Sequence, residues 1–251
     1  MGKVYLVGAG PGAPDLVTLR AARLLEQADI VFHDALVHPE TVALARSAEK
    51  IEVGKRCGKR STAQRFINKR LVDAARKYDV VVRLKGGDPM LFGRAQEEIA
   101  ALQAAGIAYE VVPGVTAALA ASADIGISLT RRGLARTVTV ATPRVGSHEA
   151  ESDWAPAVIA ADTSVLYMGI GQAAEIARCL LDRGMRSCTP VRVVENASLP
   201  GMREYRMTLA ELPQLTERGI NGPALIMLGE VFAAEAAAAS HDVLPLITRI
   251  A

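Results

Sequence analysis

The stretch "VVRLKGGDPMLFGR", residues 81–94, passes abruptly from an apolar segment into a turn. Its first half has the β-branched composition of a strand that is buried on both faces, as in a parallel sheet. The two glycines that follow let a ligand approach the main chain, and the carboxylate of Asp88 can accept hydrogen bonds from it. The pattern equally fits a plain strand-to-helix turn in which Asp88 caps the helix. A phosphate-binding loop is disfavoured, because no Gly-Lys-Ser/Thr follows.

Strand and helix patterns alternate through the first 113 residues or so. Strand patterns occur at residues 3–8, 29–37, 50–53, 79–87 and 107–114. Helical spacing of apolar residues appears at residues 18–28, 62–78 and 93–105. One apolar face of the second helix is predicted to hold Phe66, Ile67, Leu71, Ala74 and Ala75. Alternation of this kind favours a largely parallel sheet covered by helices.

The second half of the chain has a different pattern. A helix is predicted at residues 113–126, entered through a Pro-Gly turn. Strand patterns follow at residues 137–142, 164–169, 190–198, 204–212 and 223–231, with helices near residues 172–183 and 210–218. Short links between several of these strands favour a mixed or antiparallel sheet.

We therefore expect an α/β protein of two α/β domains. The N-terminal domain is predicted over residues 1–113 with a largely parallel sheet, and the C-terminal domain over residues 114–235 with a mixed sheet. Residues 236–251 are predicted to form a tail, and the stretch "AAEAAAAS" at residues 233–240 is of low complexity and favours a helix.

Composition narrows the class of protein. Of the 251 residues, 50% are hydrophobic and 22% are charged, which is typical of a soluble globular protein. The net charge of +2, from 29 basic and 27 acidic residues, gives no argument for nucleic acid or membrane as a partner.

Cysteine and histidine usage points in the same direction. The three cysteines form no Cys-x-x-Cys pair and the four histidines lack metal-ligand spacing, so we expect reduced thiols and no metal. Neither a signal-peptide pattern nor an apolar run of about 18 residues occurs, and cytoplasm is the expected location.

The other glycine-rich turn, "GAGPG" at residues 8–12, follows the first predicted strand. It suggests that the main chain approaches a ligand at the carboxyl end of a sheet, although a plain tight turn has the same pattern. It does not fit a dinucleotide-binding fingerprint, because Pro11 stands where the helix should open. The acid that this fingerprint needs is also missing, since Asp34 falls in a predicted loop.

Nine cationic side chains stand out, and several of them fall in predicted loops at strand ends. They are Lys55, Arg56, Lys59, Arg60, Arg94, Arg131, Arg132, Arg136 and Arg144. Guanidinium groups bind carboxylates through two parallel hydrogen bonds, so a small polyanionic molecule fits this set. Solvated surface charge is the alternative for each cation taken singly.

Taken together, several long segments resemble one family. The segments "VYLVGAGPG", "PDLVTLRAARLLEQADIVFHDALV", "VGKRCGK", "VVRLKGGDPMLFGRAQEE", "VVPGVTAALAASADIGISLT" and "PALIMLGEV" are similar to the tetrapyrrole (corrin/porphyrin) methyltransferases. The resemblance covers about residues 3–231. It implies two α/β domains with the active site in a cleft between them, a homodimer, and S-adenosylmethionine as methyl donor without a metal.

The resemblance also implies the residues that contact the methyl donor. They are Pro11, Gly86, Gly87, Asp88, Leu91, Thr116, Ala117, Met168 and Ala197. Of these, Met168 equally fits a core position at the end of a strand.

The same resemblance implies an activity and residues that carry it. Two methyl groups are expected to pass to C2 and C7 of uroporphyrinogen III, giving precorrin-2. Asp34 and Lys55 match the family's proposed proton acceptor and donor, while Arg94, Glu97 and Arg132 match positions against the tetrapyrrole. Which group removes the ring proton, Asp34, Arg94 or neither, stays open at this point.

Some positions depart from the family pattern, and they keep other functions in view. Ala13 stands where the family has an acid and Ala35 where it has an arginine. One alternative is another methyl acceptor, such as a later corrin precursor, an RNA or a protein; the near-neutral charge disfavours RNA. The other is a non-catalytic binding protein, against which the retained Asp34, Lys55 and Arg94 argue.

Overall fold

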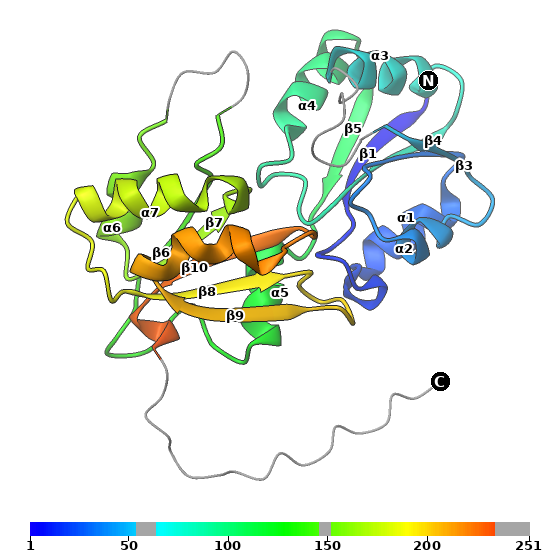
Figure 1. Cartoon of the computed structure of the whole chain (residues 1–251). Helices are drawn as coiled ribbons and strands as arrows, with labels where there is room; N and C mark the ends of the chain where they lie inside the picture. The colour runs from blue at the N-terminus through cyan, green and yellow to red at the C-terminus, as the bar shows by residue number, and fades with distance from the viewer. Residues whose placement is uncertain (54–63, 146–151, 234–251) are drawn as a thin grey trace.

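The computed structural model describes residues 1–53, 64–145 and 152–233. In this part of the chain the strands form two five-stranded sheets, the first all parallel and the second mixed (Figure 1). The predicted α/β class and the contrast between the two sheets are therefore confirmed. The predicted tail over residues 236–251 lies outside the described residues.

The first sheet has the strand order β3-β2-β4-β1-β5. Its strands are β1 (Lys3–Gly8), β2 (Ile30–His33), β3 (Glu49–Glu52), β4 (Val80–Lys85) and β5 (Ala108–Val112). Because all five run parallel, their carboxyl ends meet at one edge of the sheet, where the connecting loops lie side by side.

Helices cover both faces of this first sheet. They are α1 (Leu19–Gln27), α2 (Pro39–Ala43), α3 (Gln64–Ala75) and α4 (Ala95–Ala104). One face packs against α1 and α2, and the other against α3 and α4 (Figure 1). This double cover explains the continuous apolar runs of the strands.

Helix α3 confirms four of the five residues predicted on its apolar face. Ile67, Leu71, Ala74 and Ala75 are buried, but the prediction for Phe66 was wrong, since it is 50% exposed. At about 100° per residue, Phe66 lies on the helix surface well outside the arc that the four buried residues share. Its ring lies beneath the Arg65 guanidinium instead, 4.9 Å from ring centroid to guanidinium carbon.

The second sheet has the strand order β6-β7-β10-β8-β9. Its strands are β6 (Val138–Ala141), β7 (Thr163–Tyr167), β8 (Pro190–Glu195), β9 (Arg203–Thr208) and β10 (Ala224–Gly229). Only β6 and β7 pair in parallel among the described strands of this sheet.

The two faces of the second sheet are covered differently. On one face lie α6 (Ala155–Ala160), α7 (Ala173–Asp182) and the 3₁₀ segment η3 (Leu209–Arg218), and on the other lies α5 (Ala117–Asp124). The helix predicted near residues 210–218 is this 3₁₀ segment, and it contains Pro213. A proline inside a helix removes one backbone donor, which disfavours a regular α-helix there.

Candidate active site

Three glycines lock the carboxyl ends of β1, β4 and β5 together. A Cβ atom at Gly8 would lie 2.6 Å from the Gly114 Cα and 2.7 Å from the Gly87 carbonyl oxygen. At Gly114 a Cβ atom would likewise collide with the Gly87 carbonyl. The main chains of Gly8 and Gly114 are thus in close contact here, and the predicted approach of the main chain to a ligand stays a prediction.

The glycine-rich loop after β1 is hydrogen-bonded to the loop after β4. The Gly10 N–H donates to the Gly87 carbonyl at 3.2 Å, and the Gly87 N–H donates to the Gly10 carbonyl at 2.7 Å. Pro11 is therefore held beside the Gly86–Gly87 segment. Gly86 is exposed, and a Cβ atom at Gly87 would meet nothing within 4 Å, so this segment has one open side.

Asp88 ties its own loop to the loop after β5. Its Oδ1 accepts from the Met90 N–H at 2.8 Å and its Oδ2 from the Gly114 N–H at 2.9 Å. The interpretation of Asp88 as a helix cap was wrong, since the residue that caps α4 is Arg94. The carboxylate is too far back in the loop for that, because residues 89–93 lie between it and the cap.

Tyr167, at the end of β7, joins the second sheet to both of these loops. Its hydroxyl lies 2.6 Å from the Thr116 Oγ1 and accepts from the Ala118 N–H at 2.9 Å. The Phe92 ring, after β4, lies 5.3 Å from the Tyr167 ring, centroid to centroid. Burial raises the pKa of the Tyr167 hydroxyl, although the hydrogen bond between Tyr167 and Thr116 opposes this shift. Neither ring was singled out from the sequence.

The loop after β8 closes the arrangement. The Ser198 Oγ accepts from the Ala13 N–H at 2.9 Å, and the Ser198 N–H donates to the Asp124 Oδ2 at 2.5 Å. A Cβ atom at Gly12 would lie 2.9 Å from the Leu199 Cγ, so the two loops are in close contact. Ala197, predicted to contact the methyl donor, is buried beside Ser198.

These contacts bring together the segments that carry all nine residues predicted to contact the methyl donor. Eight of the nine positions lie in five loops, which follow β1, β4, β5, β7 and β8, and Ala117 is the first residue of α5. Met168 is 44% exposed, so it is not the core residue that its place at a strand end also allowed. We define these five loops as the loop ring.

Backbone strain concentrates in the loop ring. Within the described residues, the non-glycine positions with positive φ are Phe92, Arg94, Met168, Asn196 and Ser198. Each such residue carries a conformational cost on the order of 1–3 kcal/mol, and strain of this kind clusters where function requires it. The strain supports a functional site here without reference to any sequence motif.

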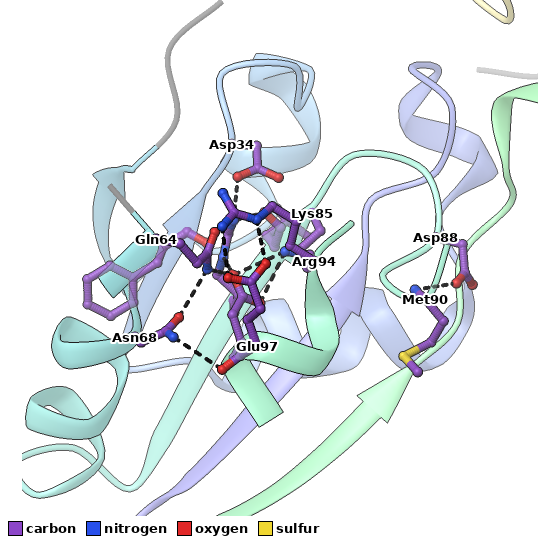
Figure 2. A network of polar contacts seen from close by, with 12 residues as sticks. Asp34, Gln64, Asn68, Lys85, Asp88, Met90, Arg94 and Glu97 are labelled. Atoms are coloured by element: carbon purple, nitrogen blue, oxygen red, sulfur yellow. Dashed lines mark hydrogen bonds and ion pairs between the residues drawn. The ribbon is translucent and has the colours of Figure 1, made fainter. Parts of the chain in front are cut away.

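Asp34 and Arg94 lie at the same edge of the first sheet as the loop ring. Asp34 directly follows β2, and its Oδ1 accepts from the Arg83 Nη2 at 2.5 Å (Figure 2). The neighbouring Leu36 has its Cβ 3.6 Å from the position of a Cβ atom at Gly86, so the loop after β2 borders the open glycine segment.

Arg94 and Glu97 form a two-pronged ion pair at the start of α4. The Arg94 Nε donates to the Glu97 Oε1 at 2.6 Å, and its Nη2 donates to the Oε2 at 2.8 Å (Figure 2). Both side chains are exposed, and the hydrogen bond from Arg94 lowers the pKa of the Glu97 carboxyl. A guanidinium in this pose already binds a carboxylate, although that carboxylate belongs to the protein.

The two remaining predicted residues are not joined to the site by these contacts. Arg132 is exposed in the turn after α5 that the hydrogen bonds between Arg131 and Ala135 close, and this turn is not part of the loop ring. Lys55 lies outside the described residues.

Two further features bear on the class of protein. Among the residues that the structure describes, no group of three or more His, Cys, Asp or Glu side chains is placed to hold a metal ion. In the same part of the chain, every helix is too short or too polar to cross a bilayer.

Comparison with known proteins identifies the family. Residues 3–213 match the model of the tetrapyrrole (corrin/porphyrin) methylases. The match takes in the whole first sheet and every loop of the loop ring. The chain therefore belongs to this family, as the resemblance of its motifs predicted.

Individual relatives define the branch of the family. The chain is 46% identical over 231 residues to a uroporphyrinogen-III C-methyltransferase of Pseudomonas aeruginosa, covering 92% of this chain and 94% of that protein. It is 48% identical over 232 residues to a siroheme synthase of Chromobacterium violaceum, covering 92% of this chain but 49% of that protein. The chain thus spans about half the length of the siroheme synthases that it matches.

A solved structure agrees with these relatives. A uroporphyrin-III C-methyl transferase from Thermus thermophilus, complexed with S-adenyl homocysteine, superposes with a TM-score of 0.81 at 43% sequence identity. The match covers 92% of this chain and 98% of that one.

Proposed function

We propose that this protein is an S-adenosylmethionine-dependent C-methyltransferase that methylates uroporphyrinogen III at C2 and C7. The products are precorrin-2 and S-adenosylhomocysteine. The observation that carries the proposal is the loop ring, in which loops from both sheets meet beside the exposed Gly86. The names of the relatives at 46% and 43% identity support the same reaction.

The loop ring suits the methyl donor, which has a flat base, ribose hydroxyls and a charged amino-acid end. The open side of the Gly86–Gly87 segment offers main-chain groups without side chains in the way. Thr116 and Ala117 are half-buried beside it, and the exposed Met168 offers an apolar surface. Residues of the loop ring thus fit the donor, and we assign the nine predicted positions to it.

Arg94 is assigned to substrate binding rather than to proton removal. Its guanidinium stays protonated at neutral pH and has no acceptor atom, so it cannot serve as a base. Its fork already binds the Glu97 carboxylate in the geometry that a substrate carboxylate requires. A carboxylate arm of the tetrapyrrole replaces Glu97 or shares the cation with it, and Arg132 is assigned to another arm.

Asp34 is assigned as the proton acceptor. The donor supplies a methyl group on a positively charged sulfur, and the C–S electrons remain on sulfur as the new C–C bond forms. The methylated ring system then carries one extra positive charge, which it loses by releasing a proton. The Asp34 carboxylate, with its side chain 29% exposed at the sheet edge, accepts this proton. Lys55 keeps its predicted role as proton donor.

The proposal includes the organisation of the molecule. Residues 1–113 and 114–235 are assigned to two domains, since each range contains one complete five-stranded sheet. A homodimer follows from the family resemblance. A reducing compartment such as the cytoplasm suits the free thiols of Cys179 and the exposed Cys188.

The proposal is tested with S-adenosylmethionine labelled in its methyl group and uroporphyrinogen III made enzymatically under anaerobic conditions. We expect two labelled methyl groups per tetrapyrrole. A parallel titration with S-adenosylhomocysteine reports binding of the donor product. If the protein binds S-adenosylhomocysteine but leaves uroporphyrinogen III unlabelled, the substrate assignment is wrong. Later corrin precursors in the same assay then identify another acceptor.

The role of Asp34 is tested by Asp34→Asn, with Asp29→Asn as the matched control. Asp29 precedes β2, whereas Asp34 follows it, and the Asp29 carboxylate accepts from the main-chain N–H groups of Asp79 and Val80. We expect Asp34→Asn to lower kcat by about 10²- to 10⁴-fold, because a positioned base contributes about that much. Asp29→Asn should leave kcat unchanged. Equal kcat values for the two variants would remove Asp34 from the mechanism.

A further inference from the structure

A group of buried charges lies beneath Asp34 on the first sheet. Arg83 and Lys85 are 2% and 3% exposed on neighbouring same-face positions of β4, and Glu98 on α4 is 0% exposed. The Arg83 Nε donates to the Glu98 Oε1 at 3.0 Å, and the Lys85 Nζ lies 3.1 Å from both Glu98 oxygens. Figure 2 shows Lys85 within this group, with Asp34 at its outer end.

The group is balanced in charge only when Asp34 is counted. Arg83 and Lys85 supply two positive charges, while Glu98 supplies one negative charge and Asp34 the other. Asp34 is also the member that reaches the surface, at 29% side-chain exposure against 3% or less for the rest. The group therefore consists of three buried residues and one residue, Asp34, that reaches solvent at the sheet edge.

Stability does not explain why these charges are buried. Buried ion pairs are often no more stabilising than apolar residues of similar volume, because desolvation offsets the attraction. An apolar side chain is acceptable on this face of β4, since Val81, two positions before Arg83, is fully buried there. The charges at Arg83 and Lys85 thus call for another role.

The main chain of Asp34 is fixed as firmly as its side chain. The Asp34 N–H donates to the Leu84 carbonyl at 3.2 Å, which continues the pairing of β2 with β4. The Asp34 carbonyl accepts from the Val37 N–H at 3.1 Å, which closes a turn. With its main chain held at both ends, the direction of the carboxylate depends on the Arg83 contact.

We propose that Arg83, Glu98 and Lys85 are positioning residues that hold the Asp34 carboxylate in one orientation towards the methyl acceptor. Glu98 fixes the Arg83 fork from one side, and the other end of the fork fixes Asp34. Lys85 balances the charge of Glu98. This inference rests on the proposed function, because it assumes that Asp34 accepts the ring proton.

The fork orients Asp34 and does not pass a proton on. Burial alone lowers the pKa of the Arg83 guanidinium, but the charges of Asp34 and Glu98 outweigh burial and leave it raised. Arg83 therefore stays protonated throughout. Burial, together with the positive charge of Arg83, lowers the pKa of Lys85, in keeping with two cations that share one buried carboxylate.

Arg83→Lys tests the inference, with Arg192→Lys as the matched control. Arg192 is 4% exposed on β8 and binds the Phe232 carbonyl and Glu204, so both variants shorten a buried arginine. A lysine at position 83 keeps the charge but cannot hold two carboxylates through a fork. We expect kcat to fall about 10- to 100-fold in Arg83→Lys, because a displacement of about 1 Å can cost about 100-fold.

A structural defect and a positioning defect are separated by four further measurements. The KM for S-adenosylmethionine and the affinity for S-adenosylhomocysteine should stay within about twofold of wild type in Arg83→Lys, since the loop ring is intact. Thermal melting shows how much each variant loses in stability. In an Asp34→Asn background, Arg83→Lys should lower kcat no further, because Arg83 acts through Asp34.

Two results overturn the inference while leaving the proposed function standing. In one, wild type methylates uroporphyrinogen III and Arg83→Lys keeps the kcat of Arg192→Lys. In the other, the kcat losses of Arg83→Lys and Asp34→Asn multiply independently in the double variant. If Arg83→Lys fails to fold, Glu98→Asp takes its place in the same cycle, with the same expected non-additivity. A wild-type protein without methyltransferase activity overturns the inference together with the proposed function.

Discussion

Arg83 in the first sheet and Arg192 in the second are buried to nearly the same extent, yet their surroundings differ. Arg83 binds two carboxylates, and one of them, Asp34, reaches the edge where the loop ring lies. Arg192 binds the carboxylate of Glu204 and, through two nitrogens, the neutral Phe232 carbonyl, which anchors the short turn after β10. A buried arginine thus binds the carboxylate that we propose as proton acceptor in one sheet, and it anchors a chain connection in the other.

The pKa values of the two arginines shift in opposite directions for this reason. At Arg192 burial lowers the pKa, and the single carboxylate of Glu204 does not restore it. At Arg83 two carboxylates outweigh burial, and the pKa is raised. Burial of a charge is therefore a poor guide to function, whereas the identity and exposure of its partners are informative.

The largest effect on stability is expected for Glu98→Gln. This substitution leaves both Arg83 and Lys85 buried. Arg83 keeps the carboxylate of Asp34, whereas Lys85 loses the carboxylate that it binds among the contacts described. Breaking a buried ion pair from one side costs about 3–5 kcal/mol of unfolding free energy.

Chemical denaturation measures this loss, with Glu204→Gln as the counterpart in the second sheet. Glu204 is 18% exposed, so removing its charge should cost clearly less. Equal losses would show that the two sheets do not differ in how they hold charge.

A smaller effect is expected for Asp88→Ala, which we compare with Asp162→Ala because both aspartates accept main-chain N–H groups next to a strand. Asp88 accepts two main-chain N–H groups at the site, and Asp162 accepts the N–H groups of Arg136 and Thr137 before β7, away from it. Leaving such groups unpaired costs about 1–3 kcal/mol at the half-buried Asp88. We expect Asp88→Ala to weaken S-adenosylhomocysteine binding, measured by calorimetric titration.

Asp162→Ala should lower the melting temperature without changing that affinity. An unchanged affinity in Asp88→Ala as well would remove Asp88 from the donor site.

The smallest effect is expected for the contribution of Glu195 to the unfolding free energy at acidic pH. The Glu195 side chain is 1% exposed at the end of β8. Burial alone raises the pKa of the Glu195 carboxyl, but hydrogen bonds from Gly222, Asn221 and Arg203 leave it below its ordinary value of 4.5. Between the lowered pKa and 4.5 the unfolded chain binds more protons than the folded chain. The contribution of Glu195 to the unfolding free energy is therefore complete above about pH 4.5, and it is lost as the pH falls through the pKa of the folded state.

Glu195→Gln should flatten this part of the curve of unfolding free energy against pH. Chemical denaturation at several pH values between about 3 and about 6 measures this change, because carboxyl groups titrate in that range. A variant whose curve parallels that of wild type would contradict the assigned linkage.

Sequence patterns predicted most of the fold, because most strands are long enough to show an apolar, β-branched composition. The predicted strand at residues 3–8 is β1 itself, and the contrast between a parallel and a mixed sheet followed from composition and link length. Helices α2 and α6 were not predicted. They have five and six residues, which is less than two turns, so no apolar periodicity can appear.

The candidate site was predicted less completely. Motif resemblance named residues in all five loops of the loop ring, including Asp88 and Thr116, but it did not name Tyr167 or Ser198, whose side chains also join the loops. Ser198 and its partner Ala13 are 185 positions apart, and Tyr167 lies 51 positions from Thr116. Pairings over such distances depend on how the two sheets pack, which no local pattern contains.

Arg83 shows the same limit within one sheet. The sequence placed it in a strand, but its burial became explicable only with Glu98 above it on α4. The sequence left open whether Asp34, Arg94 or neither residue accepts the ring proton. The proposal for Asp34 rests on chemistry rather than on pattern, since a guanidinium has no acceptor for a proton.

The contact among Gly8, Gly87 and Gly114 has a consequence for protein engineering. Since each main chain fills the space where another residue's Cβ would stand, the three connections can be exchanged with those of a relative only as a set. A chimaera that places any side chain at Gly8 or Gly114 pushes the neighbouring strands apart. Recombination breakpoints are better placed in the turn between α5 and β6 that carries Arg132, which lies outside the loop ring.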